Sequence, residues 1–150
     1  MKTKFLYGVL FLHVALMLLS FSEQPVKLFY RYKAFFACTH TDSVHIVKTD
    51  FDQLMALPFC AKDSAGKVMA IESFEITYAE RGLYQDSTGL PIIFTDYTIT
   101  ECKGDSIPKA WRDNFLEAGH RGDTVSFDRI VVRGEDRKPF FCKRIKCVIR

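Results

Sequence analysis

Alternation of apolar and polar residues is the main pattern along this chain, and it predicts β-strands. From Phe74 to Tyr78, every second side chain is apolar and the side chains between them are polar or charged. Successive side chains of a strand point to opposite faces, so this pattern predicts one buried face over residues 68–78. Residues 26–33 alternate in the same way, and residues 91–100 are rich in β-branched and aromatic side chains. Shorter strands are predicted at 34–38 and 44–47.

The apolar positions change phase within the strand predicted for residues 124–133. Val125 and Phe127 have one parity, whereas Ile130 and Val132 have the other. A regular strand cannot bury both pairs on one face, so a bulge is expected between them, near Asp128 and Arg129. A turn at 134–137 and a final strand over 139–150 would complete a hairpin.

Two segments carry the signals of short helices. Residues 50–53 have the form of a capping box, and the helix of about two turns that follows would stop at Pro58. The second helix would have Asp105 or Ser106 as its cap and Pro108 in its first turn. It would end at Gly119 in a left-handed conformation. Loops are predicted at 60–67 and, as a short excursion from the sheet, at 81–89.

Short strands, frequent turns and two short helices together predict a compact, mostly antiparallel β-sandwich. The 150 residues are 48% hydrophobic, which is enough for one domain with a proper core. We also considered a closed sheet around a hollow, ligand-binding interior.

The first 22 residues have the pattern of a secretory signal peptide. Two lysines precede an apolar run over residues 5–19, and Ser20 and Ser22 form a small-x-small cleavage site. An exported domain of residues 23–150, in the periplasm or cell envelope, is therefore expected. The alternative is an uncleaved N-terminal anchor. A lipid anchor is not expected, because no cysteine follows the apolar run.

Charge and cysteine content narrow the possible functions. A net charge of +3 gives no reason to expect nucleic acid as a partner. An oxidising compartment would favour disulfides, but the cysteine number is odd, so at least one stays free or pairs between chains. The last two cysteines lie on opposite faces of the predicted strand and are poorly placed to bridge each other. The candidate disulfide or free thiols are Cys38, Cys60, Cys102, Cys142 and Cys147.

Candidate catalytic chemistry is sparse. Cys38 is close in sequence to His40 and His45, but no orienting partner or fourth metal ligand is evident. We therefore predict no catalytic, cofactor or metal site, and keep a thiol-dependent enzyme or redox protein as the alternative function. Residues 121–123 spell the adhesion tripeptide Arg-Gly-Asp, which turn chemistry explains better.

Trp111 and Phe115 are the candidate interaction residues. They are large aromatic side chains on a short, charged helix, and such residues are typical anchors of protein interfaces. The other interpretation is that they are core residues of a helix packed on the sheet.

An ordered series of short motifs resembles the C-terminal domain of the gliding-motility protein GldM. The motifs are a strand reading Ala70-Ile71-Glu72-Ser73-Phe74-Glu75-Ile76, a short helix, a strand of the form Gly-Asp, apolar, Phe-Asp/Glu-x-Ile within residues 119–136, and a closing hairpin. The resemblance covers roughly residues 40–150. It departs from the family at residues 134–137, which read Gly-Glu-Asp-Arg where the family usually has a turn like Gly-Pro-Asp-Gly.

This resemblance implies an immunoglobulin-like periplasmic module. In that family the complete protein forms dimers and couples the gliding and type IX secretion motor to an outer-membrane-associated ring. The expectation for this chain is a non-enzymatic interaction or scaffold module that meets a cell-envelope protein, with gliding or type IX secretion components and a second copy as possible partners. The motor function itself is not carried over.

Overall fold

The computed structural model of the chain describes residues 30–134 and 136–150. The expected signal segment, and most of the strand expected at 26–33, lie outside these residues. The strands are β1 (Lys33–Phe35), β2 (Ser43–Ile46), β3 (Cys60–Lys62), β4 (Val68–Met69), β5 (Ile71–Gln85), β6 (Pro91–Lys103), β7 (Thr124–Arg133), β8 (Pro139–Phe141) and β9 (Ile145–Ile149). The helices are α2 (Lys48–Leu54) and α3 (Lys109–Ala118).

Two sheets make up the β-structure. The larger has the order β2-β9-β7-β5-β6, with β8 also paired to β7, and the smaller has the order β1-β3-β4. All pairs are antiparallel except β2 with β9, which are parallel. The prediction of a mainly β, largely antiparallel fold with two short helices is therefore confirmed. The larger sheet is open, with β2 and β6 at its edges, so the alternative of a closed sheet is wrong.

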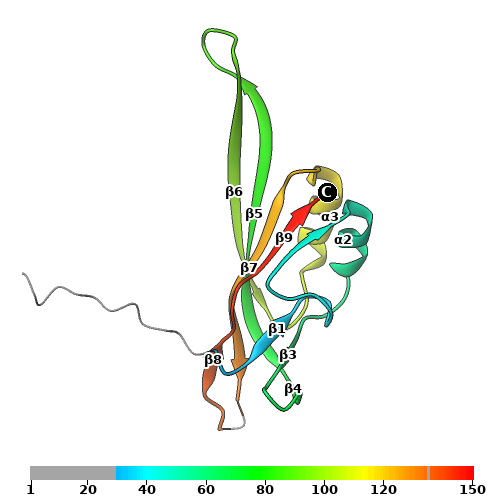
Figure 1. Cartoon of the computed structure of the whole chain (residues 1–150), viewed down its shortest axis with the longest axis vertical. Helices are drawn as coiled ribbons and strands as arrows, with labels where there is room; N and C mark the ends of the chain where they lie inside the picture. Colours follow the sequence, from blue (N-terminus) through cyan, green and yellow to red (C-terminus); the bar gives the residue numbers. More distant parts are fainter. Residues whose placement is uncertain (1–29, 135) are drawn as a thin grey trace, which may run out of the picture.

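The core lies between one face of the larger sheet and a cover made of the small sheet, α2 and α3 (Figure 1). Phe127 of β7 is fully buried at its centre, with ring centroids 5.1 Å from Phe36 and 4.7 Å from Phe59. On β5, Phe74 and Tyr78 are buried as the alternation predicted. On the other face of the larger sheet, threonines and charged residues line an open groove.

The predicted bulge in β7 is present. Ser73 pairs with Val131 but Glu75 pairs with Asp128, so β7 holds one extra residue between these pairs. Arg129 has a positive φ of 47° at this point. The bulge changes the strand's phase, and Val125, Phe127, Ile130 and Val132 are all fully buried.

Three strand predictions need correction. The loop predicted at 60–67 contains β3, which pairs with β1 and β4. The excursion predicted at 81–89 is absent: β5 continues to Gln85 in regular pairing with β6, and only the turn at 86–89 remains. The final strand is broken, since β8 and β9 pair with different parts of β7. In this region Phe141 is exposed, whereas Cys142 is buried.

Both helices exist, but their ends differ from the predictions. α2 begins at Lys48, and its cap residue Val47 makes no side-chain capping bond, so Asp50 lies inside the first turn rather than at the cap. The N-cap of α3 is Pro108 rather than Asp105 or Ser106, and its C-cap residue Gly119 has a φ of −70°, which is not left-handed. Glycine is needed there for another reason: a Cβ would lie 2.7 Å from the Phe115 ring and from its carbonyl oxygen. Within the described ranges, neither helix is long and apolar enough to cross a bilayer.

Candidate functional site

The far half of the β5–β6 hairpin projects from the body of the molecule (Figure 1). β5 pairs with β7 only as far as Ala79, opposite Thr124, whereas its pairing with β6 continues to Gln85. We call residues 80–96 the arm. Within the described residues, β5 and β6 pair over this length with no other strand, and only the base of the arm contacts the body.

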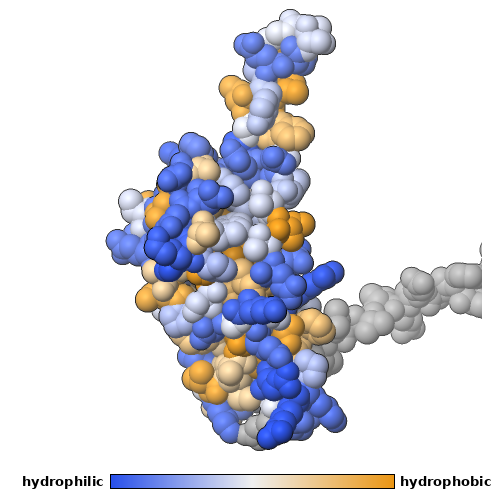
Figure 2. Space-filling view, turned by 180° about the vertical axis from the view of Figure 1, so that it is seen from behind, coloured by the Kyte–Doolittle hydropathy of each residue, from blue (hydrophilic) through white to orange (hydrophobic). Residues whose placement is uncertain are grey.

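The arm carries a concentration of exposed apolar side chains, which Figure 2 shows along the projecting hairpin. Between Arg81 and Asp96 the only charged side chain is that of Asp86, at the tip. A soluble surface seldom groups so many large apolar residues, and such a patch usually marks a binding surface. The large apolar residues exposed on the arm are Leu83, Tyr84, Leu90, Ile92, Ile93 and Phe94, with exposed fractions from 46% to 74%.

The arm has an ordered internal structure. The Tyr84 ring lies over Gly82, where a Cβ would come within 2.5 Å of a ring carbon, and it meets Phe94 edge-on at a centroid distance of 5.6 Å. At the tip, Asp86 Oδ1 accepts bonds from the Thr88 hydroxyl and from the Thr88 and Leu90 amides. These bonds, that of the Thr88 hydroxyl first, lower the pKa of Asp86. Ring packing and turn chemistry thus hold the hairpin in one shape.

β6 is the exposed edge of the larger sheet. At the two ends of the hairpin, the Asp86 amide donates to the Leu90 carbonyl and the Gly104 amide donates to the Glu72 carbonyl. In antiparallel pairing, the backbone groups of alternate residues point the other way, so those of Ile93, Thr95, Tyr97 and Ile99 face outward. Consistent with this, the Tyr97 amide donates to the Asp96 side chain rather than to β5.

Trp111 forms one wall of a cavity of about 170 Å³ between α3 and β6. Its indole nitrogen donates to Thr100 Oγ1 at 3.1 Å, and its ring is nearly parallel to that of Phe115. The two predicted interaction residues, Trp111 and Phe115, therefore differ in exposure. Trp111 is half-buried beside the sheet edge, but Phe115 is buried between Phe51 and Tyr78 and is a core residue.

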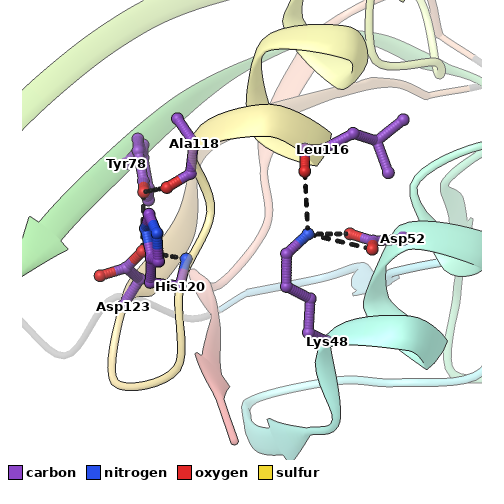
Figure 3. A network of polar contacts seen from close by, with 7 residues as sticks. All are labelled: Lys48, Asp52, Tyr78, Leu116, Ala118, His120 and Asp123. Atoms are coloured by element: carbon purple, nitrogen blue, oxygen red, sulfur yellow. Dashed lines mark hydrogen bonds and ion pairs between the residues drawn. The ribbon is translucent and has the colours of Figure 1, made fainter.

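A buried carboxylate holds the base of the arm (Figure 3). Asp123 is 0% exposed and accepts bonds from the Tyr78 hydroxyl at 2.7 Å and the His120 amide at 2.7 Å, both in Figure 3. It also accepts a bond from the Arg81 amide at 2.9 Å. Burial, and then the bond to Asp123, raise the pKa of Tyr78 well above its usual range, so its hydroxyl remains a donor. Because Asp123 is buried, residues 121–123 do not present an adhesion tripeptide.

A second polar cluster joins the two helices. Lys48 Nζ donates to both carboxylate oxygens of Asp52, at 3.1 Å and 3.0 Å, and to the Leu116 carbonyl of α3 at 3.4 Å (Figure 3). The same ammonium group lies 5.4 Å from the centre of the Phe115 ring. The α3 helix, which carries the Trp111 wall, is thereby tied to α2.

The cysteines are a disulfide and three buried thiols. Cys38 is bonded to Cys60, which removes it as a nucleophile, and the free thiols are three rather than the minimum of one. Burial, assisted by the nearby Glu101, raises the pKa of Cys102 to about 11. Burial alone raises the pKa of Cys142 to about 11 and of Cys147 to about 12. Reactive thiols need the opposite, an exposed site that stabilises the thiolate.

These three thiols are therefore expected to react slowly with iodoacetamide in the native chain at pH 8. Raised pKa values and burial should make alkylation at least about 100-fold slower than in the urea-unfolded chain. Mass spectrometry of peptides from both states gives the ratio for each thiol. A native thiol alkylated within about threefold of its unfolded rate would restore the thiol enzyme as a candidate function.

Other candidate groups lack a partner set. His40 and His45 line an open surface depression of α2 and β2, and no group of three metal-ligating side chains occurs among residues 30–134 and 136–150. On the open face, Arg144 pairs with Asp128 inside a groove of about 360 Å³. The Thr124 and Ser126 hydroxyls also line this groove, but among the described residues no hydrogen bond joins either of them to a carboxylate or an amine.

Sequence reasoning missed the arm, although a signal was present. Residues 90–94 are apolar at both parities, apart from Pro91, which differs from the one-sided alternation of β5. A strand with two apolar faces has neighbours on both sides or an exposed apolar surface, and in the described part of the chain these side chains are exposed. Comparison of the chain with protein-family models, curated proteins and solved structures gives no match.

Proposed function

We propose that this chain is an exported, non-enzymatic protein-interaction or scaffold module of the cell envelope, similar to the C-terminal domain of GldM. The observation that carries the proposal is the arm: an ordered, projecting hairpin with six exposed large apolar side chains and a free strand edge. Interfaces of stable complexes bury such residues, and an exposed strand edge offers backbone hydrogen bonds to an added strand.

Two further observations support the placement and architecture. The Cys38–Cys60 disulfide suits an oxidising compartment, in agreement with the signal pattern of residues 1–22. The small sheet packs on the larger one through Phe36 and Phe59, which supports the finer interpretation as an immunoglobulin-like sandwich. The motifs in residues 70–76 and 119–136 favour gliding or type IX secretion components as partners. The alternative of a thiol-dependent enzyme is disfavoured by the paired Cys38 and the buried remaining thiols.

The test is capture of envelope proteins by the tagged full chain after cross-linking in cells, scored by mass spectrometry. Replacing Leu83 and Ile93 by serine removes two exposed apolar side chains from one face of the arm and leaves the core unchanged. We expect at least a fivefold loss of the captured partner, since such anchors each contribute about 1–2 kcal/mol. Val68→Ser, on exposed β4 and away from the arm, is the matched control. Capture that is equal for both variants would refute the arm as the contact surface.

A further inference from the structure

β6 has a long, regular edge that pairs with no strand among residues 30–134 and 136–150. All 13 residues pair with β5 without a register shift, and the strand has no proline after Pro91. Edges of this kind are normally blocked by bulges, prolines or inward-pointing charges. Here the one local block is the Asp96 carboxylate, which accepts the bond from the Tyr97 amide. The opposite edge of the same sheet, β2, has only four residues.

We propose that the occupant of this edge is β6 of a second copy of the chain, paired antiparallel about a two-fold axis near Tyr97. This inference rests on the proposed function and names the partner of the same surface. The two larger sheets would then form one continuous sheet. Each arm would lie along the body of the other copy, and the Asp96 side chain would release the Tyr97 amide to the new pairing.

The Phe94 ring of the arm meets Trp111 of the second copy in this arrangement. With Tyr97 opposite its own copy, Phe94 lies opposite Thr100 of the second copy. Thr100 accepts the bond from the Trp111 indole, and Trp111 lines the cavity of about 170 Å³ beside β6. Phe94 and Trp111 lie on the same side of the sheet, since Phe94 and Thr100 share one parity on β6 and directly opposed residues share a face. The exposed Phe94 ring therefore lies beside the indole of the other copy.

Like charges of β6 do not directly oppose one another in this register. Asp96 lies opposite Thr98 and Glu101 lies opposite Ile93, and the two Asp96 carboxylates are diagonal neighbours across the axis. A two-fold axis at Asp96 would place this carboxylate against its own copy, which is unfavourable. An isologous pairing uses the long edge once in each copy and closes as a dimer.

Cysteine cross-linking tests the pairing directly. At a two-fold axis in a hydrogen-bonded pair the Cα atoms are about 5.5 Å apart, which a disulfide can span. Cells that produce the full chain with Tyr97→Cys are oxidised with copper phenanthroline and analysed by non-reducing electrophoresis. His45→Cys, exposed on the opposite edge, is the matched control, and the wild-type chain reports any background from native thiols.

We expect a Tyr97→Cys product at twice the chain mass, at least tenfold more abundant than the His45→Cys product. A product with a different protein would overturn the pairing of two copies and leave the proposed function standing. Absence of any product, or equal products from both variants, would overturn the pairing; loss of partner capture by the arm variant is then the separate test of the proposed function.

The register has its own test in sedimentation of two charge variants. Ile93→Lys places an ammonium group opposite Glu101 of the second copy, whereas Ile93→Glu places a carboxylate there. The contact between residue 93 and Glu101 occurs twice in the dimer by symmetry, and it is repulsive in Ile93→Glu but attractive in Ile93→Lys. The Ile93→Glu dimer should therefore dissociate roughly tenfold more readily than the Ile93→Lys dimer. Equal dissociation constants would overturn this register.

Discussion

Replacing Asp123 with alanine is expected to lower the free energy of unfolding by about 3 kcal/mol, because three donors lose their shared acceptor. The Tyr78 hydroxyl and the Arg81 and His120 amides all bind this one carboxylate, which is fully buried. The Tyr78 hydroxyl keeps the Ala118 carbonyl, 3.3 Å away, as a second acceptor, so most of the loss comes from the two amides. Urea denaturation followed by circular dichroism measures the loss.

The control for Asp123→Ala is Tyr78→Phe, which removes one donor and keeps the ring in the core. It should cost only about 1 kcal/mol. Amide hydrogen exchange adds a local readout: the Arg81 amide should exchange faster in Asp123→Ala, since its acceptor at the base of the arm is gone. A loss below about 1 kcal/mol for Asp123→Ala would show that the network contributes little to stability.

Opening the Cys38–Cys60 disulfide is expected to cost about 3 kcal/mol. The bond closes a loop of 22 residues in sequence separation, and releasing it gives the unfolded chain that much more conformational freedom. The double substitution Cys38→Ala, Cys60→Ala should move the urea midpoint down. Reducing the wild-type chain should lower it by a similar amount. Cys142→Ala, at a buried free thiol, separates loss of packing from loss of the cross-link. An unchanged midpoint in both the reduced and doubly substituted chains would contradict the prediction.

The strands of the sheet were predictable because side-chain period is a local property. The alternation from Phe74 to Tyr78 and the phase change between Phe127 and Ile130 each fix which face is buried, and the bulge follows from steric necessity. The helix before Gly119 was likewise predicted, from Pro108 near its start and the glycine after its end. The reason for that glycine was not, since the close Phe115 ring is a contact that periodicity does not report.

The arm and the hydrogen bonds of Asp123 depend on pairing between segments far apart in sequence, which local patterns do not encode. Arg81 and Gly82 have turn chemistry, yet regular pairing with β6 overrides it, and the Tyr84 ring covers the glycine. The sequence around Asp123 is typical of a turn. Its role as an acceptor depends on Tyr78 and Arg81 of β5, which are distant in sequence. Cys38 was one of several thiols free to pair, because sequence does not give connectivity.

The parallel pairing of β2 with β9 has a consequence for the order of folding. Residues 145–149 lie between β2 and β7, so residues 43–46 have no place in the sheet until a segment about 100 positions later has arrived. Contacts so distant in sequence form slowly, because the intervening chain must first be closed into a loop. β5, β6 and β7 can pair as soon as residues 71–133 are available, whereas β2 joins the sheet only after almost the whole chain has been synthesised.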